Sequence, residues 1–344
     1  MPHPETMKAW LYASTSPSVT HNLEFTPTAR TPQPPSHPSQ LLIKVHCTSL
    51  NPADYKVPQQ STILGKPLIC NLPASPGLDF SGEVVAVHPN HNGEFKPDDR
   101  VFGCLARPRQ FGTTAEYVLA ETNDTVHLPA GVSFDDGACL GVAARTAYQS
   151  LKGYITPDAS RGQQQKVLIN GGSGGCGVFA IQIAKSLGAH VVTTCSGRNA
   201  ELVRGLGADE VLDYTAVNVT DALKERGQVF DHVVDHIGLP GDLYAEAHHF
   251  LKEGGVWVQV GAAGIMTAVW RLLTPRWLGG GRRWFVALMM KNSKEDLGVV
   301  GDLVNEGKLR VIKEPVYGFA QVKEAYEKLG SGRARGKIVV RVVE

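Results

Sequence analysis

The alternation of apolar and polar positions divides the chain into two regions of different character. In the first 130 residues, short β-branched or alternating runs predict strands at Lys8–Ala13, Leu41–Ser49, Phe80–Val87 and Ala115–Leu119. Beyond about residue 128, apolar runs of five or six residues alternate with segments of helical length. This alternation is typical of a parallel sheet with helical crossovers, and the last 35 residues return to short strands and one helix.

The second region opens with a helix signal. Ser133 is an N-cap residue, and Asp135 and Asp136 place acidic side chains in the first turn of a helix that can extend to Leu151. Strands and helices then follow in turn. The strands are predicted at residues 166–170, 190–195, 210–214, 230–237 and 256–260.

A glycine-rich loop follows the first of these strands and opens a helix. Gly172, Gly174 and Gly177 form the pattern G-x-G-x-x-G in the strand–loop–helix context that dinucleotide binding requires. Glycines permit a tight turn and the close approach of a pyrophosphate, whose charge is then stabilised at the helix N-terminus. We expect the loop to bind a dinucleotide through Gly172, Ser173, Gly174, Gly175, Cys176 and Gly177.

The end of the second predicted strand favours NADPH over NADH. An NAD site normally has an acid there, which accepts from the ribose 2′-hydroxyl. This chain has no acid between Thr193 and Asn199. Ser196 and Arg198 can instead hydrogen-bond and neutralise a 2′-phosphate, although Arg198 could equally be a solvated residue at the start of a helix.

Length and charge limit the classes of function. A chain of 344 residues exceeds what one hydrophobic core usually organises, so two domains are expected. The 34 basic and 33 acidic residues leave a net charge of +1, with no basic surplus for a nucleic-acid partner. Six cysteines without a CxxC pair predict reduced thiols, and we expect a cytoplasmic protein.

The sequence predicts neither a membrane span nor a metal site. Met1–Lys8 carries Glu5 and no apolar run, which argues against a secretory signal. The uncharged stretch Gly254–Trp270 is 17 residues long and is interrupted by Gln259 and glycines. His232 and His236 have a strand-like context, which would separate their side chains by about 13 Å and prevent them from sharing an ion.

Several longer motifs occur along nearly the whole chain. They are Ser49–Lys56, Pro76–Val85, Asp99–Gly103, Ala144–Leu151, the glycine loop, Leu206–Tyr214 and Arg335–Val340. With these motifs the chain resembles the medium-chain dehydrogenase/reductase superfamily, in its zinc-independent quinone oxidoreductase and enoyl reductase branch. Residues 282–288 and 308–310 are similar to the reticulon-interacting oxidoreductases, and Thr194–Val203 is similar to fungal trans-acting enoyl reductases.

The resemblance implies an α/β fold with two domains. We expect a GroES-like, β-rich catalytic domain at residues 1–128, completed by residues 310–344. A Rossmann domain, a doubly wound parallel sheet that binds NADP, is expected at residues 129–309. Zinc-dependent relatives carry Cys near Leu50 and a Gly-His-Glu at Gly77–Asp79, and their four-cysteine lobe is absent after Cys104, so no zinc is expected.

The resemblance also implies roles for particular residues. Asn51 would lie beside the nicotinamide ribose, and Tyr55 and Lys56 would lie at the substrate cleft, so that all three are candidate catalytic residues. The other expected cofactor contacts are Thr146, then Ser196, Arg198 and Tyr214 around the 2′-phosphate, Ile237, Gly261 and Ala262 beside the nicotinamide, and Lys337 from the tail. There are structural alternatives, because Tyr214 can be a core residue, Lys56 a solvated one and Asn51 part of a turn.

The function expected is an NADPH-dependent reductase that transfers hydride to a quinone, or to a C=C bond conjugated to a carbonyl. Lys56 and Tyr55 are the candidates for stabilising enolate charge, and the final proton can come from water. A cofactor-binding protein with a structural role and little turnover is one alternative. A carbonyl or alcohol dehydrogenase is the other, and the missing zinc ligands argue against its zinc-dependent form.

Two surface expectations complete the prediction. Arg283–Leu288 is a short apolar strand that would be exposed at a sheet edge unless it pairs, and the resemblance implies a homodimer through it. Residues 264–284 combine tryptophans with arginines, which is typical of a lid over a largely apolar substrate; peripheral membrane contact is the alternative.

Overall fold

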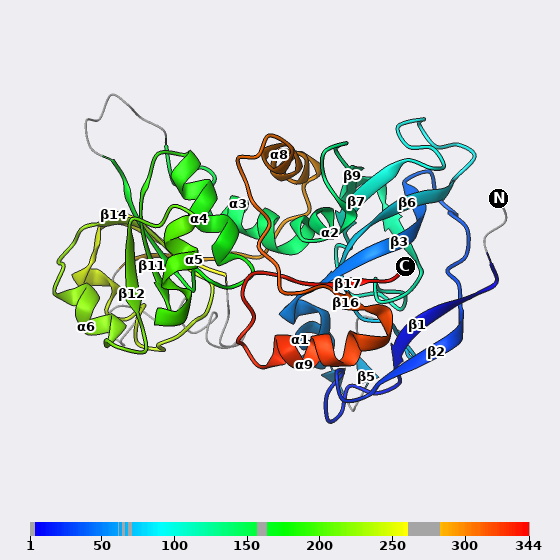
Figure 1. Cartoon of the computed structure of the whole chain (residues 1–344), viewed down its shortest axis with the longest axis horizontal. Coiled ribbons are helices and arrows are strands. Elements are labelled where there is room, and N and C mark those ends of the chain that lie inside the picture. Colours follow the sequence, from blue (N-terminus) through cyan, green and yellow to red (C-terminus); the bar gives the residue numbers. More distant parts are fainter. Residues whose placement is uncertain are drawn as a thin grey trace. The chain divides into compact units, whose positions relative to one another are not determined.

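The chain folds into two compact units (Figure 1). The computed structural model describes residues 4–60, 62–63, 66–67, 71–156, 164–260 and 283–343. Unit 1 comprises Met1–Arg145, Asn292–Gly307 and Val311–Glu344. Unit 2 comprises Thr146–Lys291 and Lys308–Arg310.

Unit 1 is built on a mixed sheet. Its described strands are β1 Thr6–Tyr12, β2 Leu23–Arg30, β3 Gln40–Leu50, β4 Thr62–Ile63, β5 Lys66–Pro67, β6 Asp79–Val87, β7 Arg100–Cys104, β8 Tyr117–Glu121, β9 Thr125–His127, β16 Tyr317–Gly318 and β17 Ile338–Arg341. The main sheet has the order β16-β17-β3-β6-β7-β9, and β8 pairs with β3 beside this path. The pairs of β3 with β6 and with β17 are antiparallel, and the four strands predicted in this region are confirmed.

Four α-helices and a π-helical turn accompany this sheet in the described part of unit 1. They are α1 Pro52–Gln60, α2 Phe134–Gly137, the π-helical turn η2 Leu140–Ala144, α8 Lys294–Asn305 and α9 Val322–Gly330. The predicted N-cap is confirmed, because the Ser133 hydroxyl accepts from the Asp136 N–H at 3.1 Å. α9 packs Val322 and Tyr326 into a core with Tyr12 and Leu50. This core joins the end of the chain to its beginning.

The boundary between the units lies further along the chain than the sequence predicts. Residues 129–145 and Asn292–Gly307 were expected in the Rossmann domain but belong to unit 1. The Phe134 carbonyl accepts from Ser81 Oγ on β6, and the Val142 N–H donates to the Asp79 carboxylate at 2.7 Å. A helix signal in the sequence does not tell which sheet the helix packs against, and tertiary contacts decide it here.

Unit 2 contains the predicted parallel sheet. Its strands are β10 Lys166–Asn170, β11 His190–Cys195, β12 Glu210–Asp213, β13 Phe230–Asp235, β14 Leu251–Gln259 and β15 Trp284–Ala287. Their order is β12-β11-β10-β13-β14-β15, and each neighbouring pair is parallel. This is the strand order of a doubly wound dinucleotide-binding fold, so the predicted Rossmann domain is confirmed.

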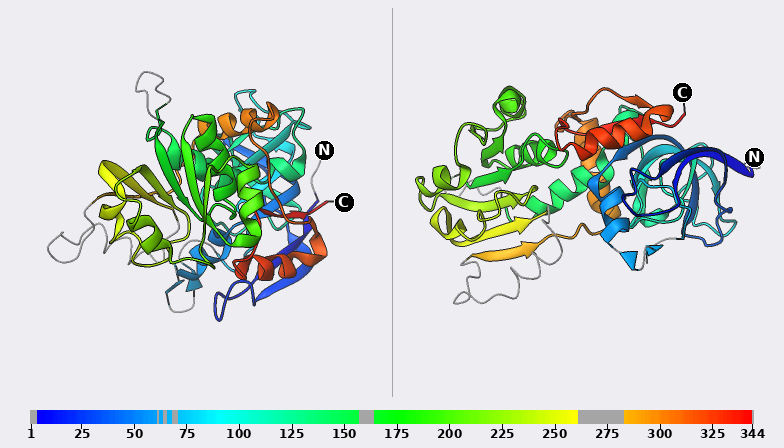
Figure 2. Two further views of the ribbon diagram at one scale, coloured as in Figure 1. Left: turned by 60° about the vertical axis from the view of Figure 1, so that its left-hand side comes forward. Right: turned by 90° about the horizontal axis from the view of Figure 1, so that it is seen from below.

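Helices connect these strands and complete the core of unit 2. They are α3 Arg145–Leu151, α4 Gly177–Ser186, α5 Ala200–Gly205 and α6 Val219–Lys224. α4 packs against β10 and β11, while Leu168, Val233, Phe250 and Trp257 lie in one buried apolar cluster. β12 and β15 are the two edge strands of the described sheet, and the right-hand view of Figure 2 shows β15 at one edge. No helix in the described residues has the length and apolar character needed to cross a membrane.

Candidate functional site

The loop between β10 and α4 in unit 2 has no room for a side chain at two of its glycines, whereas a third glycine faces open space. A side chain at Gly172 would collide with Thr193 Oγ1, and one at Gly177 would collide with the carbonyl oxygen of Gly171. These two glycines therefore let the loop pack closely against the strands. At Gly174 the nearest atom to an added Cβ is the Gly171 carbonyl oxygen, 3.5 Å away, so this position faces open space.

This geometry fits the pyrophosphate of a dinucleotide. The loop leads directly into α4, whose first residue is Gly177. A helix N-terminus behind a glycine loop stabilises negative charge through its N–H groups and its dipole. The open space beside Gly174 is where a phosphate can approach the backbone. Residues 172–177 are thus the part of unit 2 that could hold the phosphates.

The turn after β11 carries buried polar atoms that lack a partner within the described chain. The hydroxyl of Ser196, a residue only 7% exposed, has no hydrogen-bond partner there, and neither has the amide oxygen of Asn199. Asn199 Nδ2 donates to Ser173 Oγ at 3.1 Å and so links this turn to the glycine loop. A buried polar atom without a partner costs free energy, so this turn suits a polar group of a ligand. Arg198, in the same turn, is exposed.

An acid does stand near this turn, but on the next strand. Asp213, at the end of β12, accepts from the N–H and the hydroxyl of Thr215 at 2.9 and 2.6 Å. These hydrogen bonds, with one from the Gly197 N–H, hold the pKa of Asp213 below its usual value. Its carboxylate is thus engaged within the protein. Tyr214, which follows it, is 57% exposed, so the alternative of a core residue is wrong.

A row of buried polar side chains crosses the carboxyl ends of β11, β10, β13 and β14. Thr194 donates to Asn170 Oδ1 at 2.6 Å, and Asn170 Nδ2 donates to Asp235 Oδ1 at 2.8 Å. Gln259 Nε2 donates to the other carboxylate oxygen of Asp235 at 2.9 Å. Asp235 also accepts from the Ile237 N–H at 3.0 Å. The row therefore fixes the turn after β13, where the nicotinamide contacts are predicted.

The predicted nicotinamide contacts of unit 2 are described in part. Ile237 is 48% exposed, and any side chain added at Gly171 would collide with it, so Ile237 lies against the glycine loop. Thr146 is the first residue of unit 2 and is buried in α3. Gly261 and Ala262 lie outside the described residues, as do residues 264–282 of the predicted lid.

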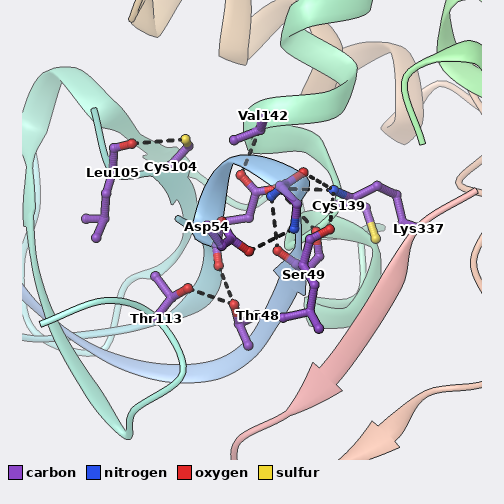
Figure 3. A network of polar contacts seen from close by, with 12 residues as sticks. Thr48, Ser49, Asp54, Cys104, Leu105, Thr113, Cys139, Val142 and Lys337 are labelled. Carbon is purple, nitrogen blue, oxygen red and sulfur yellow. Dashed lines mark hydrogen bonds and ion pairs between the residues drawn. The ribbon is translucent and has the colours of Figure 1, made fainter. Parts of the chain in front are cut away.

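In unit 1 the predicted residues Asn51 and Lys337 meet in a buried polar network. Figure 3 shows Lys337, Ser49 and Asp54 among the side chains of this network. Lys337 Nζ lies 2.5 Å from Asn51 Oδ1, 3.3 Å from the Leu50 carbonyl oxygen and 3.4 Å from Asp79 Oδ2. Asn51 Nδ2 donates to Asp79 Oδ2 at 2.9 Å and to the Ser49 carbonyl oxygen at 3.2 Å. The side chains of Lys337 and Asp79 are 2% and 0% exposed, so they form a buried ion pair.

Asp54 holds the backbone of Asn51 from the first turn of α1. Its Oδ2 accepts from the Asn51 N–H at 2.8 Å and from the Tyr326 hydroxyl at 3.3 Å. Burial raises the pKa of Asp54 to about 8, so the carboxyl group is mostly protonated at neutral pH. The Tyr55 ring meets Tyr326 edge to face, and burial followed by the nearby Asp54 raises the pKa of Tyr55. Lys56 is exposed.

The residues around Asp79 do not fit a zinc ion. Zinc sites use nitrogen, sulfur or carboxylate ligands in a near-tetrahedral set. The Asp79 carboxylate already accepts hydrogen bonds from Val142, Ser49, Asn51 and Lys337, and the adjacent Leu78 offers no ligand atom. Across the described residues, no group of three or more His, Cys, Asp or Glu side chains could hold a metal.

Comparison with known proteins agrees with this architecture. The alcohol dehydrogenase GroES-like domain matches residues 37–130, and the zinc-binding dehydrogenase family matches residues 206–340. A trans-enoyl reductase of Aspergillus terreus is 40% identical over 99% of this chain and 98% of its own length. A mitochondrial NAD(P)H oxidoreductase of Danio rerio is 34% identical over 90% and 85% of the two chains. The structure of the quinone oxidoreductase from Coxiella burnetii has a TM-score of 0.83 at 32% identity, covering 98% of this chain and 99% of its own.

The chain belongs to the medium-chain dehydrogenase/reductase superfamily. Its relatives include trans-enoyl reductases and quinone oxidoreductases, so the predicted likeness to these two groups is confirmed. This medium-chain reductase is therefore an oxidoreductase with a GroES-like unit and a Rossmann unit, and its superfamily indicates a nicotinamide cofactor.

Sequence reasoning missed several polar residues of this medium-chain reductase. Asp79 and Asp54 both lie within quoted motifs, yet neither was singled out as a site residue. The available signal for Asp79 was a charged residue at the start of an apolar strand. Asn170 and Asp235 carried a similar signal, since each ends a buried parallel strand on the side where ligands bind.

Proposed function

We propose that this medium-chain reductase is NADPH-dependent and zinc-independent. In this proposal it transfers hydride to a quinone, or to the C=C bond of an α,β-unsaturated carbonyl compound. The carrying observation is the turn after β11, where the buried, unpartnered Ser196 hydroxyl and the exposed Arg198 stand in place of an acid. A hydroxyl and a guanidinium suit the 2′-phosphate of NADPH, and an acid would repel it.

The glycine loop and the residues around it would hold the rest of the dinucleotide. The backbone from Gly174 to Gly177 would take the pyrophosphate, while Thr146, Tyr214 and Ile237 would contact the remaining parts. Gly261 and Ala262 are proposed contacts on the nicotinamide side. When bound, the nicotinamide supplies the hydride, so the protein needs only to align the reactants and stabilise developing charge.

Unit 1 would supply Asn51, an acceptor that orients the ligand, and Tyr55 or Lys56, donors that stabilise an enolate or a reduced quinone. Asn51 is held from both its backbone and its side chain, so it can present its amide oxygen in one fixed orientation. The Tyr55 hydroxyl is protonated at neutral pH, as in tyrosines generally, so it can donate to a developing oxyanion. Lys56 is exposed on the same helix and is the second candidate for this charge.

The polarity of the substrate, the cellular location and the oligomeric state are also part of the proposal. The apolar residues in the sequence of segment 264–284 support a largely apolar substrate. A cytoplasmic location stays a prediction, and the Danio rerio relative is mitochondrial. A homodimer through β15 is proposed on the ground that this apolar strand lies at an edge of the described sheet.

The proposal is tested by oxidising NADPH with a panel of quinones, enones and enoyl thioesters, with the metal content measured on the same sample. Turnover with NADPH in metal-free protein is expected for at least one substrate class. NADPH binding without any turnover would favour the alternative of a structural, cofactor-binding protein. Activity that needs stoichiometric zinc would contradict the proposal.

A further inference from the structure

The Lys337 ammonium fills a cage of three oxygen atoms in unit 1. The oxygens belong to the Leu50 carbonyl, the Asn51 amide and the Asp79 carboxylate, at 3.3, 2.5 and 3.4 Å. An ammonium group has three N–H donors and no acceptor, so these oxygens use all of its donors. Since the side chain is only 2% exposed, Lys337 has no donor left for a group outside the cage.

The same contacts leave Asn51 only one orientation of its amide. Its Oδ1 must face Lys337, which can only donate, and its Nδ2 must face Asp79, which accepts. The second hydrogen of Nδ2 goes to the Ser49 carbonyl oxygen at 3.2 Å. Both amide hydrogens are therefore used, and the second lone pair of Oδ1 is what remains free on the Asn51 side chain.

The Asp79 carboxylate is buried and has four hydrogen-bond donors. Its Oδ2 accepts from the Ser49 hydroxyl, Asn51 Nδ2 and Lys337 Nζ, and its Oδ1 accepts from the Val142 N–H. The buried charge is thus compensated by one cation and three neutral donors, and the side chain is 0% exposed.

We propose that Lys337 is a positioning residue, whose ammonium group is permanently bound by the buried oxygens of Leu50, Asn51 and Asp79. Paired with Asp79, it fixes Asn51 so that this side chain accepts one hydrogen bond from a hydroxyl or N–H group of the bound ligand and donates none. This inference rests on the proposed function for the identity of the ligand, NADPH or its substrate. It differs from the expectation that Lys337 itself contacts the cofactor, because Lys337 acts through Asn51.

A purely stabilising role explains the ion pair less well. Burying two charges costs about as much free energy as their attraction returns, and an apolar pair of equal size is often at least as stable. The ion pair fixes the orientation of the Asn51 side-chain amide, because it brings three distant segments of the chain into contact with that one group. β17 pairs antiparallel with β3, with Ile338 opposite Leu50, and this register brings Lys337 beside Asn51.

The test compares Lys337→Met, Asp79→Asn and the double variant that carries both changes. The double variant removes both charges at nearly constant volume, so it keeps the protein testable if a single variant does not fold. Lys294→Met is the matched control, because it removes a lysine of unit 1 that pairs with Glu94 at the surface. The readouts are thermal unfolding, kcat and KM with NADPH, and the side-chain amide signals of Asn51 by NMR without ligand.

The double variant should unfold near the wild-type temperature while its kcat/KM falls about 100-fold, the scale expected from misplacing a positioned group. The two Asn51 amide signals, distinct in the wild type, should move together towards the free-amide position. In an Asn51→Ala background, Lys337→Met should add little further loss, because Lys337 acts through Asn51. The Lys294→Met variant should match the wild type throughout.

Two results would overturn the proposal. One is full activity of the double variant, which would make the ion pair structural only. The other is an unchanged pair of Asn51 amide signals in Lys337→Met. A wild-type protein that binds no NADPH would refute the proposed function instead, and the ligand-free NMR readout would still decide the role of Lys337.

Discussion

The ammonium of Lys337 lies 2.5 Å from the amide oxygen of Asn51, although 286 residues separate them in the chain. The two residues belong to different segments of the chain within unit 1: Asn51 follows β3, and Lys337 precedes β17. Because β3 and β17 are antiparallel neighbours, the residue after one strand lies beside the residue before the other. The end of the chain is thus part of the candidate site.

Arg198 should discriminate between the two dinucleotides. Replacing Arg198 with Ala should weaken NADPH binding by about 1.5–3 kcal/mol, the scale of a charged hydrogen bond, and leave NADH binding almost unchanged. Dissociation constants from fluorescence titration with each dinucleotide measure the effect. Arg204→Ala, an exposed arginine on the following helix, is the control and should change neither value. Equal losses for both dinucleotides would remove the basis for NADPH preference.

Two glycine substitutions in the loop should have different effects, one on protein stability and the other on NADPH binding. Gly177→Ala should destabilise the protein by about 1–3 kcal/mol, because the new methyl group meets the backbone of Gly171. Gly174→Ala has room for its methyl group and should fold normally, yet bind NADPH at least about tenfold more weakly by blocking the phosphate. Thermal unfolding and NADPH titration of both variants measure the two effects. Unaltered NADPH affinity in Gly174→Ala would place the phosphates elsewhere.

Asp54 should make the stability of unit 1 depend on pH. Its pKa is about 8 in the folded protein and about 4 in an unfolded chain, so the folded state holds the extra proton between these values. The free energy of unfolding that this group contributes is present below about pH 4 and is lost as the pH rises to about 8. Asp54→Asn should flatten this decline, which denaturant unfolding across the pH range measures. The exposed Asp302→Asn serves as control, and a decline that persists unchanged in Asp54→Asn would contradict the assignment.

β15 should mediate dimer formation. The Leu288 N–H bonds to Gln259 on β14 at 2.9 Å. Because N–H groups alternate sides along a strand, the N–H of Ala287 faces away from β14. Ala287→Pro should therefore yield a monomer without breaking the pairing with β14, while Ala287→Ser stays dimeric. Sedimentation velocity at micromolar concentration measures this. A monomeric wild type, or a dimeric proline variant, would count against β15 as the interface.

Much of the fold could be predicted because its signals are local. The five-residue apolar runs, the Ser133 cap and the glycine spacing each depend on neighbours in the sequence, and the structure confirms the strands and the cap. The unit boundary could not be predicted in this way. Residues 134–145 are mainly helical, as expected, but the contacts of this segment with Ser81 and Asp79 on β6 place it in unit 1.

The same distinction between local and long-range signals holds for the candidate site. The glycine loop and the turn at Ser196 are contiguous motifs, so their place in unit 2 could be predicted. The partnership of Asp79 with Lys337 depends on the register of β17 against β3, which no local pattern encodes. The same holds for Asn170 and Asp235, whose hydrogen bond crosses between two strands 65 residues apart.

Hydride transfer from NADPH in metal-depleted protein tests the central claim most directly. NADPH deuterated at C4 is incubated with quinones, enones and enoyl thioesters after exhaustive chelation, and the product and the metal content are analysed. We predict NADPH oxidation with equimolar reduced quinone, or deuterium on the carbon β to the carbonyl, at a metal content far below one per chain. Loss of turnover on chelation and its return with zinc, or transfer only from NADH, would contradict the account.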